Sequence, residues 1–139
     1  MDAMGYEGKF YYGVAGSTAA TLIENVVNLD YSKDPERGNT TIRGDGSTPP
    51  IVTSRVTGLK PQIVWTMINQ TADAALTAFR VAAATGAAIA LRTKDHDSGK
   101  GFDGDVTISE KEGQPLHGEQ TFEFTAEATR ALRTPQIYV

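Results

Sequence analysis

The segment "QIVWTMI" (Gln62–Ile68) carries apolar side chains on both faces of the strand that it predicts. Successive side chains of a strand point to opposite sides, so alternate residues share a face. A single sheet packed on one core covers only one face of each strand. The second face therefore needs a cover of its own, which could be a helix or another subunit. The two faces are Ile63, Trp65 and Met67, and Val64, Thr66 and Ile68.

The same period of two extends through the segments on either side, which predicts a chain rich in half-buried strands. In the last of these segments, alternate apolar residues (Phe122, Phe124, Ala126) face away from polar ones. Pro61 marks a break or an entry at a sheet edge, because proline cannot donate to a ladder. The expected strands are Glu24–Ser32, Ile51–Lys60, Gln62–Ile68, Ala87–Asp95, Asp105–Glu110 and Glu119–Thr129.

One helix is predicted at about residues 72–85, within "TADAALTAFRVAAATG" (Thr71–Gly86). Thr71 can cap its N-terminus, Asp73 suits the positive end of the helix dipole, and Gly86 suits a C-terminal stop. Most other positions are alanine, which allows a sheet to approach closely. The apolar stripe expected to pack on that sheet is Leu76, Phe79 and Ala83.

Two long polar loops interrupt the strands, "GNTTIRGDGSTPP" (Gly38–Pro50) and "DHDSGKGFDGD" (Asp95–Asp105). The first loop contributes one large apolar residue, Ile42, so it adds little to a core. Strands, one helix and two polar loops together predict a mainly β fold, a β-sandwich or barrel with one packed helix.

Length and composition favour one domain spanning residues 1–139. Thirteen Lys and Arg against 17 Asp and Glu give a net charge of −4, which provides no basic footprint for nucleic acid. The absence of cysteine excludes a disulfide framework. No stretch approaches the ~20 apolar residues of a membrane span. The N-terminus is acidic and lacks an apolar segment, so no signal peptide is expected, and folding in a reducing cytoplasm fits best.

No catalytic, cofactor-binding or metal-binding residue emerges from the motifs. Asp95, Asp97, Asp103 and Asp105 gather in the second loop, but a calcium loop starting at Asp95 would need glycine and glutamate where Lys100 and Val106 stand. A solvated hairpin loop is expected instead. "SGKG" lacks the first glycine of a phosphate-binding loop. Neither histidine belongs to a recognisable nucleophile motif. Three further carboxylates are expected on one exposed strand face: Glu119, Glu123 and Glu127.

Between Val27 and Asp105 the features of the chain follow a particular order: a strand ending in "NLDYSKD", the loop "RGNTTIRGDG", the step and strand "TGLKPQIVWTMI", the helix "DAALTAFRVAAATG" and the strand "AAIALRTKD". In this order of features the chain resembles the tail tube proteins of long-tailed bacteriophages. The late "GQPLHGEQTFEFTAEAT" is similar to the closing strand of that family. The chain departs from the family at "TPP", where an aromatic residue is common, and at "KPQ", which replaces an acidic step.

This resemblance implies a virion structural protein, with no enzymatic activity and no cofactor. Such subunits form hexameric rings that stack into a hollow tube, a fold shared with the inner tube protein of type VI secretion. The tube is assembled in the host cytoplasm, becomes part of the virion tail, and conducts DNA without binding it specifically or entering a membrane. Further partners would be the tape measure, the terminator, the baseplate or tip and, where one exists, the sheath. A tailocin, a gene transfer agent or a secretion device remains an alternative.

Contacts between subunits are expected at the first loop and at the outer face of "QIVWTMI". The loop is long and polar, and its Arg43 and Asp45 suit pairing across a seam between rings. An acidic chain suits a conduit, because duplex DNA carries a negative charge about every 1.7 Å and would bind a basic wall. The expected contact residues are Asn39, Thr40, Thr41, Ile42, Arg43, Asp45, Val64, Thr66 and Ile68.

Two other classes of protein fit the composition. A small-ligand-binding β-barrel would be a monomer with Trp65, Phe122 and Phe124 as the walls of an internal cavity. A hydrolase would bring Asp or Glu side chains together in a concave cluster with shifted pKa values.

Overall fold

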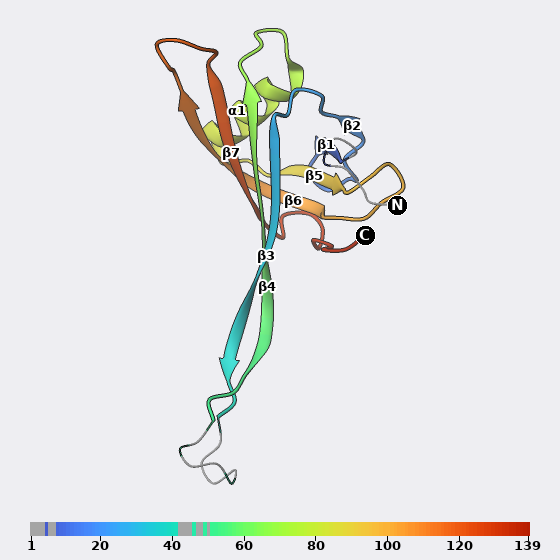
Figure 1. Ribbon diagram of the computed structural model, residues 1–139. Coiled ribbons are helices and arrows are strands. Elements are labelled where there is room, and N and C mark those ends of the chain that lie inside the picture. The colour runs from blue at the N-terminus through green and yellow to red at the C-terminus, as the bar shows by residue number, and fades with distance from the viewer. Residues whose placement is uncertain (1–4, 6–7, 42–45, 47–48, 50) are drawn as a thin grey trace.

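The computed structural model describes residues 5, 8–41, 46, 49 and 51–139. In this part of the chain, seven antiparallel strands form one curled sheet with the order β2-β1-β5-β6-β7-β4-β3, accompanied by one helix (Figure 1). The mainly β fold with one packed helix is therefore confirmed. The elements are β1 Lys9–Val14, β2 Thr21–Leu22, β3 Asn28–Asn39, β4 Ser54–Ile68, α1 Ala74–Thr85, β5 Ile89–Lys94, β6 Asp103–Gly113 and β7 Thr121–Ala128.

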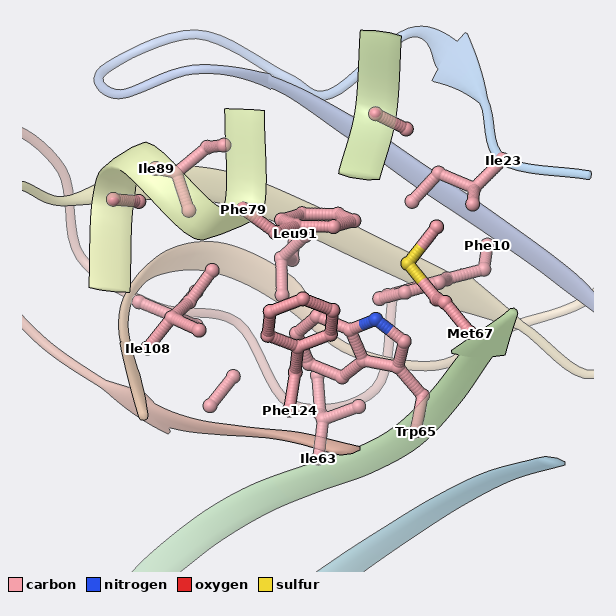
Figure 2. Close-up of a cluster of buried hydrophobic side chains, with 14 of the residues drawn as sticks. Phe10, Ile23, Ile63, Trp65, Met67, Phe79, Ile89, Leu91, Ile108 and Phe124 are labelled. Atoms are coloured by element: carbon pink, nitrogen blue, oxygen red, sulfur yellow. The ribbon is translucent and has the colours of Figure 1, made fainter. Parts of the chain in front are cut away.

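The core lies between α1 and the inner face of the sheet, and aromatic rings occupy its centre (Figure 2). Trp65 from β4 meets Phe79 from α1 edge to face, with ring centroids 5.1 Å apart. Phe124 from β7 packs 5.5 Å from Trp65 and 5.6 Å from Phe79. The predicted inner face of "QIVWTMI" is confirmed, because Ile63, Trp65 and Met67 are all buried.

β3 and β4 are longer than the sequence predicts. β3 continues past the predicted end at Ser32 to Asn39, so it includes the first two residues of the predicted polar loop. β4 is one continuous strand, so a break at Pro61 is wrong. Pro61 does mark an edge. The β4 residues before it pair with β3 alone, whereas from Gln62 onward β4 pairs with β3 on one side and with β7 on the other.

The second polar loop ends earlier than predicted, because β6 begins at Asp103. Asp95 and Asp97 are exposed, whereas Asp103 and Asp105 are buried. The four aspartates are thus divided between a solvated turn and the sheet, and the expectation of a hairpin loop that exposes all of them is wrong. Val106 and Ile108 follow in β6 and are both buried.

α1 begins two residues later than the sequence predicts, at Ala74. Its N-cap is Asp73, whose carboxylate accepts hydrogen bonds from the backbone N–H groups of Ala75 and Leu76 at 3.0 and 3.4 Å. The prediction of Thr71 as the cap is wrong, because Thr71 lies in the preceding turn. Gly86 ends the helix in the left-handed region with φ 74°, as predicted, and its N–H donates to the carbonyl of Ala82.

Replacing Asp73 with alanine is expected to lower the free energy of unfolding by about 1–2 kcal/mol, because two helix N–H groups lose their acceptor. The Asp73 carboxylate also accepts a hydrogen bond from Asn25 Nδ2 at 3.1 Å, which adds to the loss. Urea denaturation followed by circular dichroism measures the change. The matched control is Thr71→Ala, for which a change within about 0.5 kcal/mol is expected. Equal losses in the two variants would contradict the assignment of the cap.

Candidate assembly surfaces

β3 and β4 extend together away from the sheet as a two-stranded arm, Asp34–Asn39 paired with Ser54–Lys60 (Figure 1). Six residues of strand at about 3.4 Å each give it a reach of about 20 Å. A β-bulge between Glu36 and Arg37 shifts the register partway along it. Every arm residue is exposed or half-exposed, so the arm contributes nothing to the core of its own subunit.

The arm carries apolar side chains into solvent. Val56 and Leu59 are each 49% exposed, and Val52 beside the tip is 81% exposed. An isolated two-stranded ribbon is at best marginally stable in water. Contact with another surface would bury these side chains and stabilise the ribbon.

Part of the predicted loop site lies at the far end of the arm. The Thr40 N–H donates to the carbonyl of Thr53 at 2.9 Å, and the hydroxyls of the same two residues are 2.8 Å apart. Thr41 Oγ1 accepts from the Thr53 N–H at 2.9 Å, while the Thr41 N–H donates to Asn39 Oδ1. Asn39, Thr40 and Thr41 are therefore held together at the tip. The predicted contact residues that lie outside the described part are Ile42, Arg43 and Asp45.

The outer face of β4 presents the other predicted contact residues, Val64, Thr66 and Ile68, all half-buried. Their neighbours across the sheet are polar. Thr66 lies opposite Asn28 and Glu123, and Val64 lies opposite Asp30 and Thr125. The outer face is thus mixed, with apolar side chains from β4 between polar side chains from β3 and β7.

The charges on this outer face are mainly acidic around β3, β4 and β7, whereas by register Lys9, Arg92 and Lys94 lie on it at β1 and β5. Asp30, Glu123 and Glu127 lie on it by their register, and Lys111 lies opposite Glu123. Lys60 pairs with Glu127 at 3.7 Å, but both side chains are more than half exposed, so the pair adds little stability. Glu123 and Glu127 are exposed strand residues, as predicted, and Glu119 lies in the loop before β7.

The C-terminal segment, residues 129–139, packs on the outer side of β6 and is bound there to a buried carboxylate of that strand. Asp105 is fully buried and accepts hydrogen bonds from the Gly16 N–H at 3.0 Å, from Arg133 Nε at 3.1 Å and from the Leu132 N–H at 3.3 Å. Arg133 also pairs with Asp103 at 2.8 Å. One carboxylate thus joins the β1–β2 turn, β6 and the C-terminal segment.

The pKa of Asp105 reflects two opposing effects. Burial by itself raises the pKa, but the hydrogen bonds from Gly16, Arg133 and Leu132 outweigh it and lower the pKa below the usual value for aspartate. The carboxylate is therefore charged in the folded chain at neutral pH. The sequence alone offered one signal for this cluster, two aspartates at alternate positions in "DGD", and it was interpreted as a solvated loop.

A second surface that the sequence did not indicate is a cleft of about 1090 Å³, here called the lysine cleft. It lies between β1 and β5 on one side and the segment from β2 to β3 on the other. Leu22, Val27 and other apolar side chains line it, and Leu22 and Val27 are 43% and 56% exposed. The lysines that line it are Lys9, Lys33, Lys94 and Lys100.

An apolar groove of about 880 Å³ runs beside α1 and β1. Three large apolar side chains at its rim are strongly exposed: Val14 at 79%, Leu132 at 73% and Val81 at 56%. The floor of this groove includes alanines of α1, the residues that were predicted to let a sheet approach the helix closely.

The alternatives that require an internal site find no support in the packing. Trp65, Phe122 and Phe124 are each at most 1% exposed and pack in the core, so the prediction that they line a ligand cavity is wrong. Among the described residues, no group of three or more His, Asp or Glu side chains is placed to hold a metal ion. The helix of the described part is too short to span a bilayer.

The arm, the curled sheet and the single helix together match solved structures of tail proteins. A chain from the tail of an empty gene transfer agent particle with C6 symmetry superposes with a TM-score of 0.79 at 16% identity, covering 99% of this chain and 100% of that one. A chain from the virion of a native gene transfer agent particle gives 0.72 at 14% identity, with 99% of each chain covered.

The SPP1 tail tube gives a TM-score of 0.66 at 12% identity, covering 91% of this chain and 75% of that one. No protein-family model and no curated protein sequence matches the chain. The structural likeness to the two gene transfer agent chains extends over nearly the whole of residues 1–139 and shows that this chain has their fold.

Proposed function

We propose that this chain is a structural subunit that self-assembles into hexameric rings, and that the rings stack into the hollow tail tube of a phage or a related particle. The observation that carries the proposal is the arm, which projects from the sheet with Val56 and Leu59 half exposed. A second copy that covers the arm would supply the burial that its own subunit does not.

The edges of the sheet support growth into a ring. β3 lies at one edge of the sheet and β2 at the other. An edge strand presents backbone N–H and C=O groups that another chain can pair with. A head-to-tail contact between different surfaces closes into a ring when its rotation allows. The C6 symmetry of the gene transfer agent tail supports six subunits as the number for this chain.

The outer face of the sheet is our candidate for the wall of the lumen. Its acidic side chains, among them Glu123 and Glu127, would repel the DNA backbone and let it pass without specific binding. Val64, Thr66 and Ile68 then line the wall or meet the neighbouring subunit at its seam. In this proposal the chain has no catalytic role and no cofactor, and it meets the tape measure, terminator and baseplate or tip proteins at the ends of the tube.

Assembly of the purified chain tests this proposal. Sedimentation velocity is expected to show a species of about six subunits or larger, and negative-stain images are expected to show rings or tubes roughly a hundred ångströms across, from six domains of ordinary compactness. A chain that stays monomeric at high protein concentration, over a range of salt and pH, would contradict it.

The particle to which the tube belongs is a finer question. The likeness to gene transfer agent tails favours a particle of that kind or a long-tailed phage over a secretion device. Electron microscopy of particles from the source cells, labelled with an antibody against this chain, would identify it. Label along a tail beneath a DNA-filled head is the expected result.

A further inference from the structure

The lysine cleft concentrates positive charge on an acidic chain. Four of the six lysines line it, against two carboxylates among the residues that the structure describes, Glu24 and Asp95. Tyrosine rings of the cleft lie beside two of these ammonium groups: Lys100 lies 5.3 Å from the Tyr138 ring, and Lys33 lies 5.5 Å from the Tyr31 ring. The cleft therefore has a basic rim above an apolar lining, a combination that suits an acidic partner with an apolar tip.

The chain carries such a feature at the turn between β6 and β7. Leu116 at this turn is 92% exposed, the largest exposure of any large apolar side chain in the described part. The exposed Glu112 and Glu119 flank it on the two sides of the turn. Glu112 also accepts a hydrogen bond from Gln114 Nε2 at 2.7 Å, which orders the tip. We call this feature, residues 110–120, the acidic hairpin.

The acidic hairpin and the lysine cleft lie on different sides of the subunit (Figure 1). The hairpin is at the upper left of the view, whereas β1, β5 and the C-terminus, which border the cleft, are at the right. The hairpin of one copy can therefore enter the cleft of the next, while its own cleft stays available. Such a contact repeats head to tail, as a ring or a stack requires.

We propose that the lysine cleft binds the acidic hairpin of a second copy, with Leu116 against the apolar lining and the glutamates among the lysines. This inference rests on the proposed self-assembly and names a contact that builds it. A nucleic acid would match the charge of the rim but would leave both the apolar lining and Leu116 exposed. A second copy would bury both the apolar lining and Leu116. The opposite charges of the cleft and the hairpin would also guide the encounter of the two copies and fix their register.

Charge reversal on each side separates the two surfaces. The cleft variant carries Lys94→Glu and Lys100→Glu, and the hairpin variant carries Glu112→Lys and Glu119→Lys. Each variant alone is expected to assemble at least about a hundredfold more weakly than the wild type, because like charges would face each other. All four side chains are exposed or half-exposed, so circular dichroism and thermal unfolding are expected to match the wild type.

Mixing the two variants is the decisive step. The unchanged hairpin of the cleft variant fits the unchanged cleft of the hairpin variant, and the two reversed surfaces fit each other, so alternating copies should regain assembly. Variants that assemble alone like the wild type, or a mixture that fails to recover, would overturn the inference while leaving the proposed function intact. A wild-type chain that does not assemble would overturn the proposed function and this contact together.

A disulfide tests the contact by a second route, in a chain that has no cysteine of its own. Mixed Leu116→Cys and Val27→Cys variants are expected to form a covalent dimer under mild oxidation. Val81→Cys, a similarly exposed position on α1, is the control and is expected to give little dimer with Leu116→Cys. Equal yields, or binding of a short DNA duplex that the cleft variant loses while it still assembles, would overturn the proposal.

Discussion

A chain that lacks residues 39–48 is expected to fold and form rings that no longer stack into tubes. In the arm, the described residues of β3 pair only with those of β4, and all of them are exposed or half-exposed. Removing the tip therefore takes nothing from the core, and the free energy of unfolding should change by no more than about 1 kcal/mol. The tube should be lost entirely if, as the sequence predicts, contacts between rings are made by this loop.

Negative-stain images and sedimentation of the shortened chain measure this effect, and thermal unfolding shows that the subunit is still folded. Ring formation serves as the internal control, since the edges of the sheet are unchanged. Tubes of normal length from the shortened chain would contradict a stacking role for the tip. Loss of rings together with tubes would instead place the arm in contacts within the ring.

Replacing Asp105 with alanine is expected to lower the free energy of unfolding by about 3–5 kcal/mol. The change leaves the Arg133 guanidinium without one of its two carboxylates and removes the acceptor of the Gly16 and Leu132 N–H groups. For a chain of this size the loss corresponds to a fall of about 10–20 °C in Tm. Differential scanning calorimetry measures it. The control is the exposed Asp97→Ala, expected to change stability by less than about 0.5 kcal/mol.

The contribution of Asp105 has a defined pH dependence. Its pKa is lower in the folded chain than in the unfolded chain, because its hydrogen bonds outweigh the cost of burial. The stabilisation is therefore present above the unfolded pKa of about 3.9 and is lost as the pH falls through the lower folded pKa. The difference in stability between the wild type and Asp105→Ala should shrink below about pH 4. A difference that stays constant between pH 7 and pH 3 would contradict this assignment.

The sequence was sufficient to predict structural features that depend on neighbouring residues in the chain. Alternation along β4 and β7 identified their buried faces, because period two alone decides which side chains share a face. Gly86 was identified as the helix stop, because a left-handed C-terminal residue favours glycine. The N-cap was misplaced by two residues, since Thr71 and Asp73 are both good caps and tertiary packing chose between them.

Features that depend on distant partners could not be predicted. Asp105 can be buried because Gly16, 89 residues away, and the C-terminal segment donate hydrogen bonds to it. The local sequence, two aspartates among glycines, does not indicate these distant donors. The β3 half of the arm was missed for a related reason, whereas the β4 half falls within the predicted strand Ile51–Lys60. "SKDPERGN" has the composition of a loop, and it forms a strand because β4 lies beside it. The lysine cleft gathers residues from four separate segments, and none of them by itself predicts a cleft.

Cryo-electron microscopy of the assembled protein tests most directly whether this fold is completed by copies of itself. The account predicts six-fold rings in which the arm, with Val56 and Leu59, is buried against another copy. It also predicts that the acidic outer face of the sheet lines a central channel. An assembly of another kind, or rings whose arms extend into solvent without touching a neighbour, would contradict it.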